Sequence, residues 1–505
     1  MFPEVAMNLA MPKAPDFPDG LTWFNTDHPL SFREELQGRV VILDFWTYCC
    51  INCMHVLPDL EYLERKYAAD PVVFIGVHSN KYTNEARPQN IREAILRYGI
   101  KHPVVVDDEH MIWGMYGVNA WPTLVVIDAN GYVMGSFPGE GHRDELERLI
   151  AGLLDVGRRH GSLAEGPLPK QPEKMRLSTS GLSYPGKVLV DTHGGRLFIA
   201  DSDNHRIIMT DWDGDVLGFF GSGVCGYRDG AYEDARFHNP QGMALFGNAL
   251  YIADTDNHAV RRVDLSSFHV DTAVGNGMIG YDRHGGHRGR EQSLNSPWDL
   301  AYLNGTLYIA LAGLHQIWTY DPVTTVSQVL IGTGRENITD NPARKAALAQ
   351  PSGLSVANGK LYFADSETSA VRQYDPKTGL VSTLVGKGLF IFGDEDGQED
   401  QALFQHPLGV AAQGNNIYVA DTYNHKIRKI DLHSGVVSTV AGVGEPGMLS
   451  DDQLALYEPG GLSVSGNDLF IADTNNHRII HYALDSGAWR EVVPKVGGLP
   501  LPLVA

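Results

Sequence analysis

The sequence predicts a multidomain chain in which an α/β domain is followed by an all-β domain, a six-bladed β-propeller. In the first 160 residues, short apolar β-branched runs alternate with segments of helical spacing, which is typical of an α/β domain. Beyond residue 181, a unit of 52–57 residues with short strands and Gly-rich turns occurs six times, and this period is typical of propeller blades. A chain of 505 residues is long enough to form both cores.

The N-terminal domain, predicted over residues 1–160, starts with a Pro-rich lead-in over residues 1–25. The patterns that follow predict two parallel strands with a helix between them, then a helix and a strand, a hairpin around Asn130-Gly131 and an amphipathic closing helix. The predicted ranges are Val40–Asp44, Leu57–Tyr67, Val72–Val77, Pro88–Tyr98, Pro103–Asp107, Leu124–Asp128, Tyr132–Phe137 and Asp144–His160.

A cysteine motif stands between the first predicted strand and the first helix. Three of the four cysteines, Cys49, Cys50 and Cys53, lie within five positions. A C-x-x-C at this place puts Cys50 at the helix N-terminus, where the peptide dipoles and free amide groups favour a thiolate. Because the thiolate is the attacking species in disulfide exchange, the motif predicts a redox nucleophile.

Two further residues sharpen this prediction. Asp44 lies on the strand six residues before Cys50, where a mostly buried carboxylate could accept the proton of the second thiol. Pro58 would bend the helix that follows the cysteines. Much later, Trp121-Pro122-Thr123 precedes an apolar strand.

The segments just described resemble the thioredoxin fold, and specifically its thiol-reductase branch with a central helix-plus-strand insert. The resemblance implies a thioredoxin-like domain in which Cys50 attacks, Cys53 resolves the mixed disulfide, Asp44 relays a proton and a cis Pro122 faces the cysteine pair. It further implies a groove for a protein thiol or disulfide partner. The residues expected to contribute to that groove are Trp46, Tyr48, Cys49, Trp121 and Thr123.

The cysteine loop departs from the family pattern. Tyr48-Cys49-Cys50-Ile51-Asn52-Cys53 lacks the Gly-Pro found between the cysteines of many relatives, so a redox potential cannot be transferred. Cys49 and Cys53 also form a C-x-x-x-C, which in related copper chaperones holds Cu(I) on soft thiolates. No paired His follows at a fixed offset, so we expect no metal site and no cofactor. A small buried side chain is an equally good interpretation of Cys49.

Residues 161–180 are polar and proline-bearing, which predicts a linker, although Met175–Thr179 could add a strand to the next domain. The repeats fill residues 181–505. Long Gly-rich loops join them; Cys225 lies in the first loop, and Arg283–Arg290 in the second is the most basic stretch. No P-loop Lys-Ser/Thr follows their G-x-G, so these loops are interpreted as architecture.

Polar residues repeat at the end of the second strand of the units. The aligned positions are Asp201, Asp254, Leu311, Asp365, Asp421 and Asp473, and Asn-His pairs follow in the turns at 204–205, 257–258, 424–425 and 476–477. The third unit keeps only His315, and the fourth has neither residue. Because a unique active site needs one special position, we interpret the repeated residues as hydrogen-bonding groups of the turns.

These repeated residues resemble the NHL repeat, so the second domain is expected to be an NHL-type propeller. The order of a thioredoxin-like domain before six such repeats resembles the NHL repeat-containing protein 2 family, whose members carry a C-C-I-N-C motif like Cys49–Cys53. The resemblance covers nearly the whole chain and implies an oxidoreductase-like first domain.

Composition narrows the class of protein. The formal net charge is -21, with 14 Lys/Arg against 23 Asp/Glu up to Glu165 and therefore 26 against 38 beyond it, so neither part has the net basic charge of a nucleic-acid binder. No apolar run has the length of a membrane span, and the N-terminus lacks a signal-peptide pattern. Four cysteines, three of them in one motif, suit a reducing compartment, so a cytoplasmic location is expected.

The sequence therefore supports three functional hypotheses. The first is a thiol–disulfide oxidoreductase whose propeller recruits a protein or peptide partner. The second is a non-catalytic interaction scaffold with a degenerate thioredoxin-like domain. The third, a metal-dependent enzyme in the propeller, is the weakest because such sites need a ring of singular His, Asp or Glu residues, whereas these are repeated.

Overall fold

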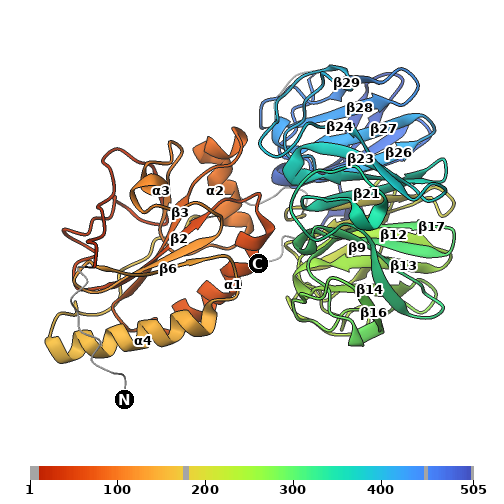
Figure 1. Cartoon of the computed structure of the whole chain (residues 1–505). Helices are drawn as coiled ribbons and strands as arrows, with labels where there is room; N and C mark the ends of the chain where they lie inside the picture. Colours follow the sequence, from red (N-terminus) through yellow and green to blue (C-terminus); the bar gives the residue numbers. More distant parts are fainter. Residues whose placement is uncertain (1–10, 175–180, 448–452, 502–505) are drawn as a thin grey trace. The chain divides into compact units, whose positions relative to one another are not determined.

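The computed structural model describes residues 11–174, 181–447 and 453–501. The chain divides into two compact units, residues 1–176 and 177–505 (Figure 1). The first is a mixed α/β domain and the second a six-bladed β-propeller, so the predicted fold class is confirmed.

The first unit is built on one six-stranded sheet with the order β1-β4-β3-β2-β5-β6. Strands β2, β3 and β4 are parallel, and the other pairings are antiparallel. The central strands are apolar on both faces, as strands covered on both sides must be. The strands span Trp23–Phe24 (β1), Val40–Trp46 (β2), Val72–His78 (β3), Val104–Val106 (β4), Thr123–Ile127 (β5) and Val133–Pro138 (β6).

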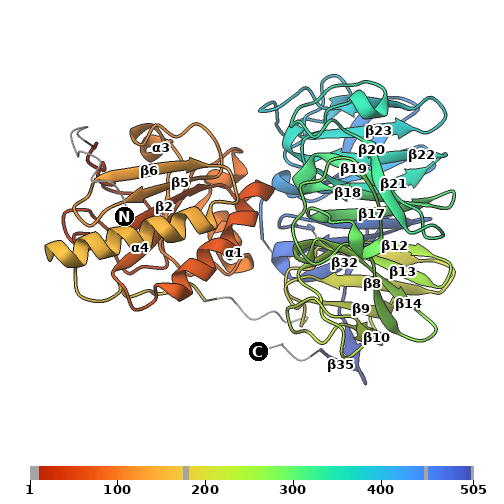
Figure 2. The same cartoon turned by 60° about the horizontal axis from the view of Figure 1, so that its bottom comes forward.

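Helices cover both faces of this sheet. Helices α1 (Ile51–Lys66) and α4 (Arg143–His160) pack on one face, where Figures 1 and 2 show them next to each other. The short helix α3 (Met111–Met115) packs on the opposite face with the N-terminal segment around Phe17 and Leu21. Helix α2 (Pro88–Arg97) and the one-turn η1 (Asn84–Ala86) form the predicted insert before β4. Pro58 lies inside α1, as expected.

Two segments differ from their predicted roles. The Pro-rich lead-in contributes strand β1 to the sheet edge beside β4. Residues 163–174, predicted as linker, lie against the first unit: Leu163 and Leu168 pack on its two cores, and the Glu173 N–H donates to Asn25 Oδ1. These apolar side chains find partners that composition alone does not reveal, so the first unit extends beyond residue 160. The strand suggested for Met175–Thr179 lies outside the described residues.

The propeller consists of six antiparallel sheets, each contributing one blade of four consecutive strands. Blade one comprises β7 Lys187–Asp191, β8 Arg196–Asp201, β9 Arg206–Asp211 and β10 Val216–Phe220. Blade two comprises β12 Pro240–Phe246, β13 Ala249–Asp254, β14 Ala259–Asp264 and β15 His269–Val274. Blade three comprises β17 Pro297–Leu303, β18 Thr306–Leu311, β19 Gln316–Tyr320 and β20 Val326–Ile331. Blade four comprises β21 Pro351–Ala357, β22 Lys360–Asp365, β23 Ala370–Asp375 and β24 Leu380–Val385. Blade five comprises β26 Gly409–Gln413, β27 Asn416–Asp421, β28 Lys426–Asp431 and β29 Val436–Ala441. Blade six comprises β30 Gly461–Ser465, β31 Asp468–Asp473, β32 Arg478–Ala483 and β33 Trp489–Val492.

Short elements complete the blades. A fifth strand pairs with the outer strand of blades two, three and five, and a hairpin follows blade six; these are β11 Gly230–Ala231, β16 Gly285–Arg288, β25 Gly397–Gln398, β34 Lys495–Val496 and β35 Leu499–Pro500. One-turn helices follow many second strands or lie in the loops: η2 Thr255–Asn257, η3 Gly289–Glu291, η4 Ala312–Leu314, η5 Ala343–Lys345, η6 Ser366–Thr368, η7 Thr422–Asn424 and η8 Thr474–Asn476.

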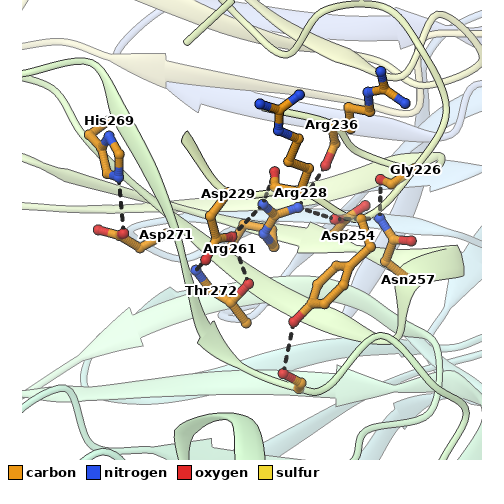
Figure 3. A network of polar contacts seen from close by, with 12 residues as sticks. Gly226, Arg228, Asp229, Arg236, Asp254, Asn257, Arg261, His269, Asp271 and Thr272 are labelled. Carbon is orange, nitrogen blue, oxygen red and sulfur yellow. Dashed lines mark hydrogen bonds and ion pairs between the residues drawn. The ribbon is translucent and has the colours of Figure 1, made fainter. Parts of the chain in front are cut away.

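The repeated carboxylates hold the blades together. Asp254 is fully buried, and its Oδ1 accepts from the His238 N–H at 2.7 Å. Figure 3 shows that its Oδ2 accepts from Asn257 and Arg261, each at 2.8 Å. The equivalent carboxylates each accept one backbone N–H and one arginine N–H, and these are Asp201, Asp365, Asp421 and Asp473. The interpretation of the repeated residues as structural hydrogen-bonding groups is therefore confirmed.

The repeated histidines join neighbouring blades. His205 Nδ1 accepts from the Asn239 N–H at the start of blade two, at 3.2 Å. His477 of blade six accepts in the same way from the Tyr184 N–H, which closes the ring onto blade one. The other members of the series are His258, His315 and His425, and in blade four the Ser369 hydroxyl takes this role.

Blade three departs from this pattern. Leu311 stands where the carboxylate is expected and Trp318 where blades two, four and five have arginine, and both side chains are buried in an apolar cluster. Apolar packing thus replaces the ion pair in this blade. A separate buried pair joins Lys187 on β7 to Asp299 on β17, and Asp299 also accepts from the Leu354 N–H of blade four. This pair links inner strands of non-adjacent blades inside the ring.

Candidate functional site

The cysteine motif lies where strand β2 passes into helix α1. Cys50 is the residue before the first helical turn, with extended backbone angles, and its carbonyl accepts from the N–H groups of Cys53 and Met54 at 3.0 and 3.2 Å. No side chain caps this helix, so the dipole and amide groups of its first turn face the Cys50 position without a competing carboxylate. The predicted position of the nucleophile agrees with this geometry.

Cys53 lies one helical turn further on and is deeply buried, with an exposed fraction of 1%. Burial, followed by the hydrogen bond and the charge of the neighbouring Cys50 thiol, raises the pKa of Cys53 well above its ordinary value. Cys53 therefore holds its proton, and a thiol of this kind must pass it to an acceptor before it can attack a disulfide.

Asp44 is a second buried titratable group of this region. It lies on β2, is 2% exposed, and neither carboxylate oxygen has a hydrogen-bond partner among the described residues. Burial raises the pKa of Asp44 to about 7, although the nearby His102 opposes the shift. The charge of Asp44 in turn contributes to the raised pKa of Cys53, so the two groups influence each other electrostatically.

The segment around Pro122 borders the cysteine loop. The Trp121–Pro122 peptide bond is cis, and strand β5 begins at Thr123, which pairs with Phe45 of β2. Pro122 therefore lies beside the end of β2, from which the cysteine loop departs. The Trp121 indole donates to the Ser79 carbonyl at 2.9 Å, and the Thr123 hydroxyl donates to the Ala120 carbonyl at 2.7 Å. These bonds fix the backbone next to the predicted groove.

Trp46 and Tyr48, both predicted to bind a partner, enclose a histidine that the sequence analysis did not single out. His78 ends β3 opposite Trp46; its ring stacks on Tyr48 at 5.5 Å and meets Trp46 edge-on at 5.0 Å. Burial lowers the pKa of His78 to about 3, so the imidazole is neutral. Neither of its nitrogens has a hydrogen-bond partner in the described ranges. Trp46 is fully buried here, a placement that suits a supporting wall better than direct contact with a partner.

Cys49 is held by a second residue that sequence reasoning missed. Its backbone N–H donates to Glu85 Oε1 at 2.9 Å, and Glu85 Oε2 accepts from the N–H groups of Lys81 and Tyr82. Glu85 is fully buried in the insert, 36 residues from the motif, where no spacing rule predicts the contact. The Cys49 side chain is buried with 4% exposure, which agrees with its interpretation as a small buried residue.

All four cysteines are free thiols: Cys49, Cys50 and Cys53 are buried and Cys225 is exposed. Across the part of the chain that the structure describes, no three His, Cys, Asp or Glu side chains lie close enough together to hold a metal ion. Within the same ranges, every helix is too short or too polar to span a membrane.

Comparison with known proteins agrees with both domains. A Thioredoxin-like family model matches residues 38–133, and an NHL repeat model matches residues 404–430 and 456–482. Along the whole chain, NHL repeat-containing protein 2 of Homo sapiens is 40% identical over 502 residues, which cover 92% of this chain and 69% of that protein. The chain belongs to the NHL repeat-containing protein 2 family.

Other relatives extend this family assignment. Protein SUPPRESSOR OF QUENCHING 1, chloroplastic, of Arabidopsis thaliana is 46% identical over 95% of this chain, which spans 47% of that protein. The chain thus spans about half the length of this plant relative. Thiol-disulfide oxidoreductase ResA of Bacillus thuringiensis is 32% identical over 117 residues, 23% of this chain and 65% of that protein. The first domain is therefore distantly related to thiol–disulfide oxidoreductases.

Proposed function

We propose that the chain is a thiol–disulfide oxidoreductase that acts on a protein partner through Cys50 and Cys53. The observation that carries the proposal is the contrast between the two thiols: Cys50 stands at an uncapped helix N-terminus, whereas Cys53 is buried with a raised pKa. The Asp44 carboxylate, which contributes to that raised pKa, accepts no hydrogen bond from the described residues. The distant relationship to ResA supports it.

In the proposed cycle the reduced protein carries two thiols. The Cys50 thiolate attacks one sulfur of the partner disulfide, forms a mixed disulfide and releases the partner's other sulfur as a thiolate. Asp44 then accepts the proton of Cys53, and the Cys53 thiolate attacks the Cys50 sulfur. This step releases the partner's second thiolate and leaves an oxidised Cys50–Cys53 pair. An external dithiol must reduce that pair before the next cycle.

The propeller is proposed to recruit the partner. Its repeated Asp and His residues are committed to holding blades together, which leaves surface loops and edges for binding. Operation in a reducing compartment is part of the same proposal. A non-catalytic scaffold is the alternative, because Ile51 and Asn52 replace the usual residues between the cysteines and both thiols are buried.

Reduction of a fluorescent glutathione disulfide in the presence of dithiothreitol tests the proposal. We expect Cys50→Ser to lose turnover and Cys53→Ser to accumulate a mixed disulfide detectable by mass spectrometry. Cys225→Ser, which removes the one exposed thiol among the four, should behave like the unmodified protein. Equal turnover by Cys50→Ser and the unmodified protein would favour the scaffold.

A further inference from the structure

A groove opens on the propeller between blades two and three. It has a volume of about 580 Å³, within the range of peptide- and ligand-binding clefts. Blade two lines it with residues of β14 and β15, and blade three with β16, η3, the end of β19 and Thr325. The basic loop singled out in the sequence forms one wall, and no structural role described above accounts for this groove.

The groove is locally basic in a chain with a net charge of -21. Three arginines line it, Arg262, Arg288 and Arg290, against two carboxylates, Asp271 and Glu291. Asp271 is already engaged, because Arg262 Nη1 lies 3.8 Å and His269 Nε2 3.3 Å from its carboxylate (Figure 3 shows the His269 contact). Arg262 is occupied by this pair and Arg290 by Asp229, so Arg288 is the lining arginine that makes no ion pair among the described residues.

A network of polar contacts around the partly buried Asp229 holds two residues of the lining. Asp229 accepts from Arg261 Nη2 at 2.7 Å and from the Thr272 hydroxyl at 2.9 Å, as Figure 3 shows, and it also pairs with Arg290. Burial alone would raise the pKa of Asp229, but Arg261 and Thr272 outweigh burial and lower it. Asp229 thus stays charged and holds Arg290 and the lining residue Thr272 in position.

Two hydrogen-bond donors of the lining are left without protein partners. Arg288 is exposed and makes no ion pair or side-chain hydrogen bond within the described ranges. Tyr320 as a whole residue is 4% exposed, and its hydroxyl makes no hydrogen bond to the same described residues. Burial raises the pKa of Tyr320 to about 12, which keeps the hydroxyl protonated. A guanidinium fork and a phenol donor together suit a carboxylate.

We propose that this groove binds an acidic peptide segment of a partner protein, with a Glu or Asp carboxylate seated on Arg288. The volume exceeds that of a single carboxylate and leaves room for neighbouring residues of the peptide. Charge complementarity favours Asp and Glu side chains, and the fixed Arg262 and Arg290 flank the contact. The inference deepens the recruitment role proposed for the propeller and rests on that role, but it does not depend on thiol turnover.

Fluorescence anisotropy with the full chain tests this assignment. The probes are a fluorescein-labelled ten-residue peptide of alternating Gly and Glu and its Gly–Gln analogue. We expect the Glu peptide to bind and the Gln peptide to bind at least tenfold more weakly. Arg288→Glu should weaken binding of the Glu peptide about tenfold or more, since it replaces attraction by repulsion.

Arg335→Glu is the matched control, because Arg335 is an exposed arginine of the next inter-blade loop, outside the groove, and the charge change is identical. Thermal unfolding of both variants checks that each is folded. Equal binding of the Glu and Gln peptides, or equal weakening by both variants, would overturn the proposal. Binding of a phosphoserine peptide without binding of the Glu peptide would overturn it as well. The disulfide assay is scored separately, so either activity can fail alone.

Discussion

Buried carboxylates occur in both domains, and their surroundings differ. Burial raises the pKa of Asp421 in the propeller as it raises that of Asp44 in the thioredoxin-like domain. Asp421, however, accepts hydrogen bonds from Gln405, Asn424 and Arg428, whereas Asp44 accepts none within the described residues. A raised pKa alone therefore does not mark a reactive group. A buried carboxylate without partners among the described residues, at a position that occurs once, is the better candidate for a reactive group.

The comparison predicts its largest effect for loss of a paired carboxylate. Asp421→Ala should destabilise the propeller by about 3–5 kcal/mol, because it leaves the fully buried Arg428 without its buried partner. Asp400→Ala removes an exposed carboxylate of the same blade and should change stability by less than about 0.5 kcal/mol. Urea unfolding followed by tryptophan fluorescence measures both; equal effects would refute the structural role.

Loss of the Asp44 carboxylate should raise the free energy of unfolding at neutral pH, whereas loss of the Asp421 carboxylate should lower it. The folded-state pKa of Asp44, about 7, lies above its ordinary value of 3.8, so the stability this group contributes at low pH is lost as the pH rises from 4 to 7. Asp44→Asn cannot ionise and should be more stable than the unmodified protein by about 2–4 kcal/mol at pH 8.

The same variant should gain only about 1 kcal/mol of stability at pH 4.5 and should show slower resolution of the mixed disulfide at neutral pH. Urea unfolding at the two pH values and stopped-flow exchange measure these effects. A stability gain of the same size at both pH values would contradict the assignment of the raised pKa to Asp44.

Variants of Glu85 test whether a hydrogen-bonded carboxylate influences the cysteine loop. Glu85→Ala leaves the N–H groups of Cys49, Lys81 and Tyr82 without this acceptor and should destabilise the first domain by about 2 kcal/mol. Exchange by Cys50 should slow as its loop loosens. Glu85→Gln keeps a hydrogen-bond acceptor and should recover part of the stability and part of the exchange rate. An unchanged exchange rate in Glu85→Ala would show that the contact has no influence on the thiol.

The smallest effect is expected at Cys49. Cys49→Ala should keep the oxidised Cys50–Cys53 bridge and most exchange activity, because a Cys49–Cys50 bridge between adjacent residues would be strained. Cys53→Ala should abolish turnover. Non-reducing peptide mapping of the oxidised protein checks the linkage, and a predominant Cys49–Cys53 bridge would instead bring the copper-type interpretation forward.

Local patterns in the sequence predict the fold because its determinants are local. The run Val40–Leu43, the helical spacing after Cys53 and the Asp that recurs in five of the six blades all act over short ranges, and the structure confirms them. The candidate site is predicted only in part. Asp44 and Cys50 follow from position along the strand and helix, whereas the contact of Glu85 with Cys49 spans 36 residues without any periodic signal.

Long-range contacts also explain the misplaced linker. Glu173 meets Asn25 across 148 residues, and composition carries no information about such a pairing. The groove between blades two and three has the same origin: Arg262 and Arg288 come from different blades, and only the ring brings them to one surface. In blade three the local pattern fails although the fold is kept: Leu311 replaces the recurring Asp, and apolar packing around it preserves the blade.

The joint between Tyr184 and His477 has a consequence for biosynthesis. It uses the same hydrogen bond as the joint between His205 and Asn239, yet it connects residues 293 apart instead of 34. Closing the longer loop costs about 2 kcal/mol more in chain entropy. On the ribosome, five blades can stack in order as they emerge, but the first must wait with an apolar edge uncovered until blade six is made. A chain that stops before His477 would leave that apolar edge exposed. Synthesis of the last repeat is therefore the step after which the nascent propeller resists aggregation.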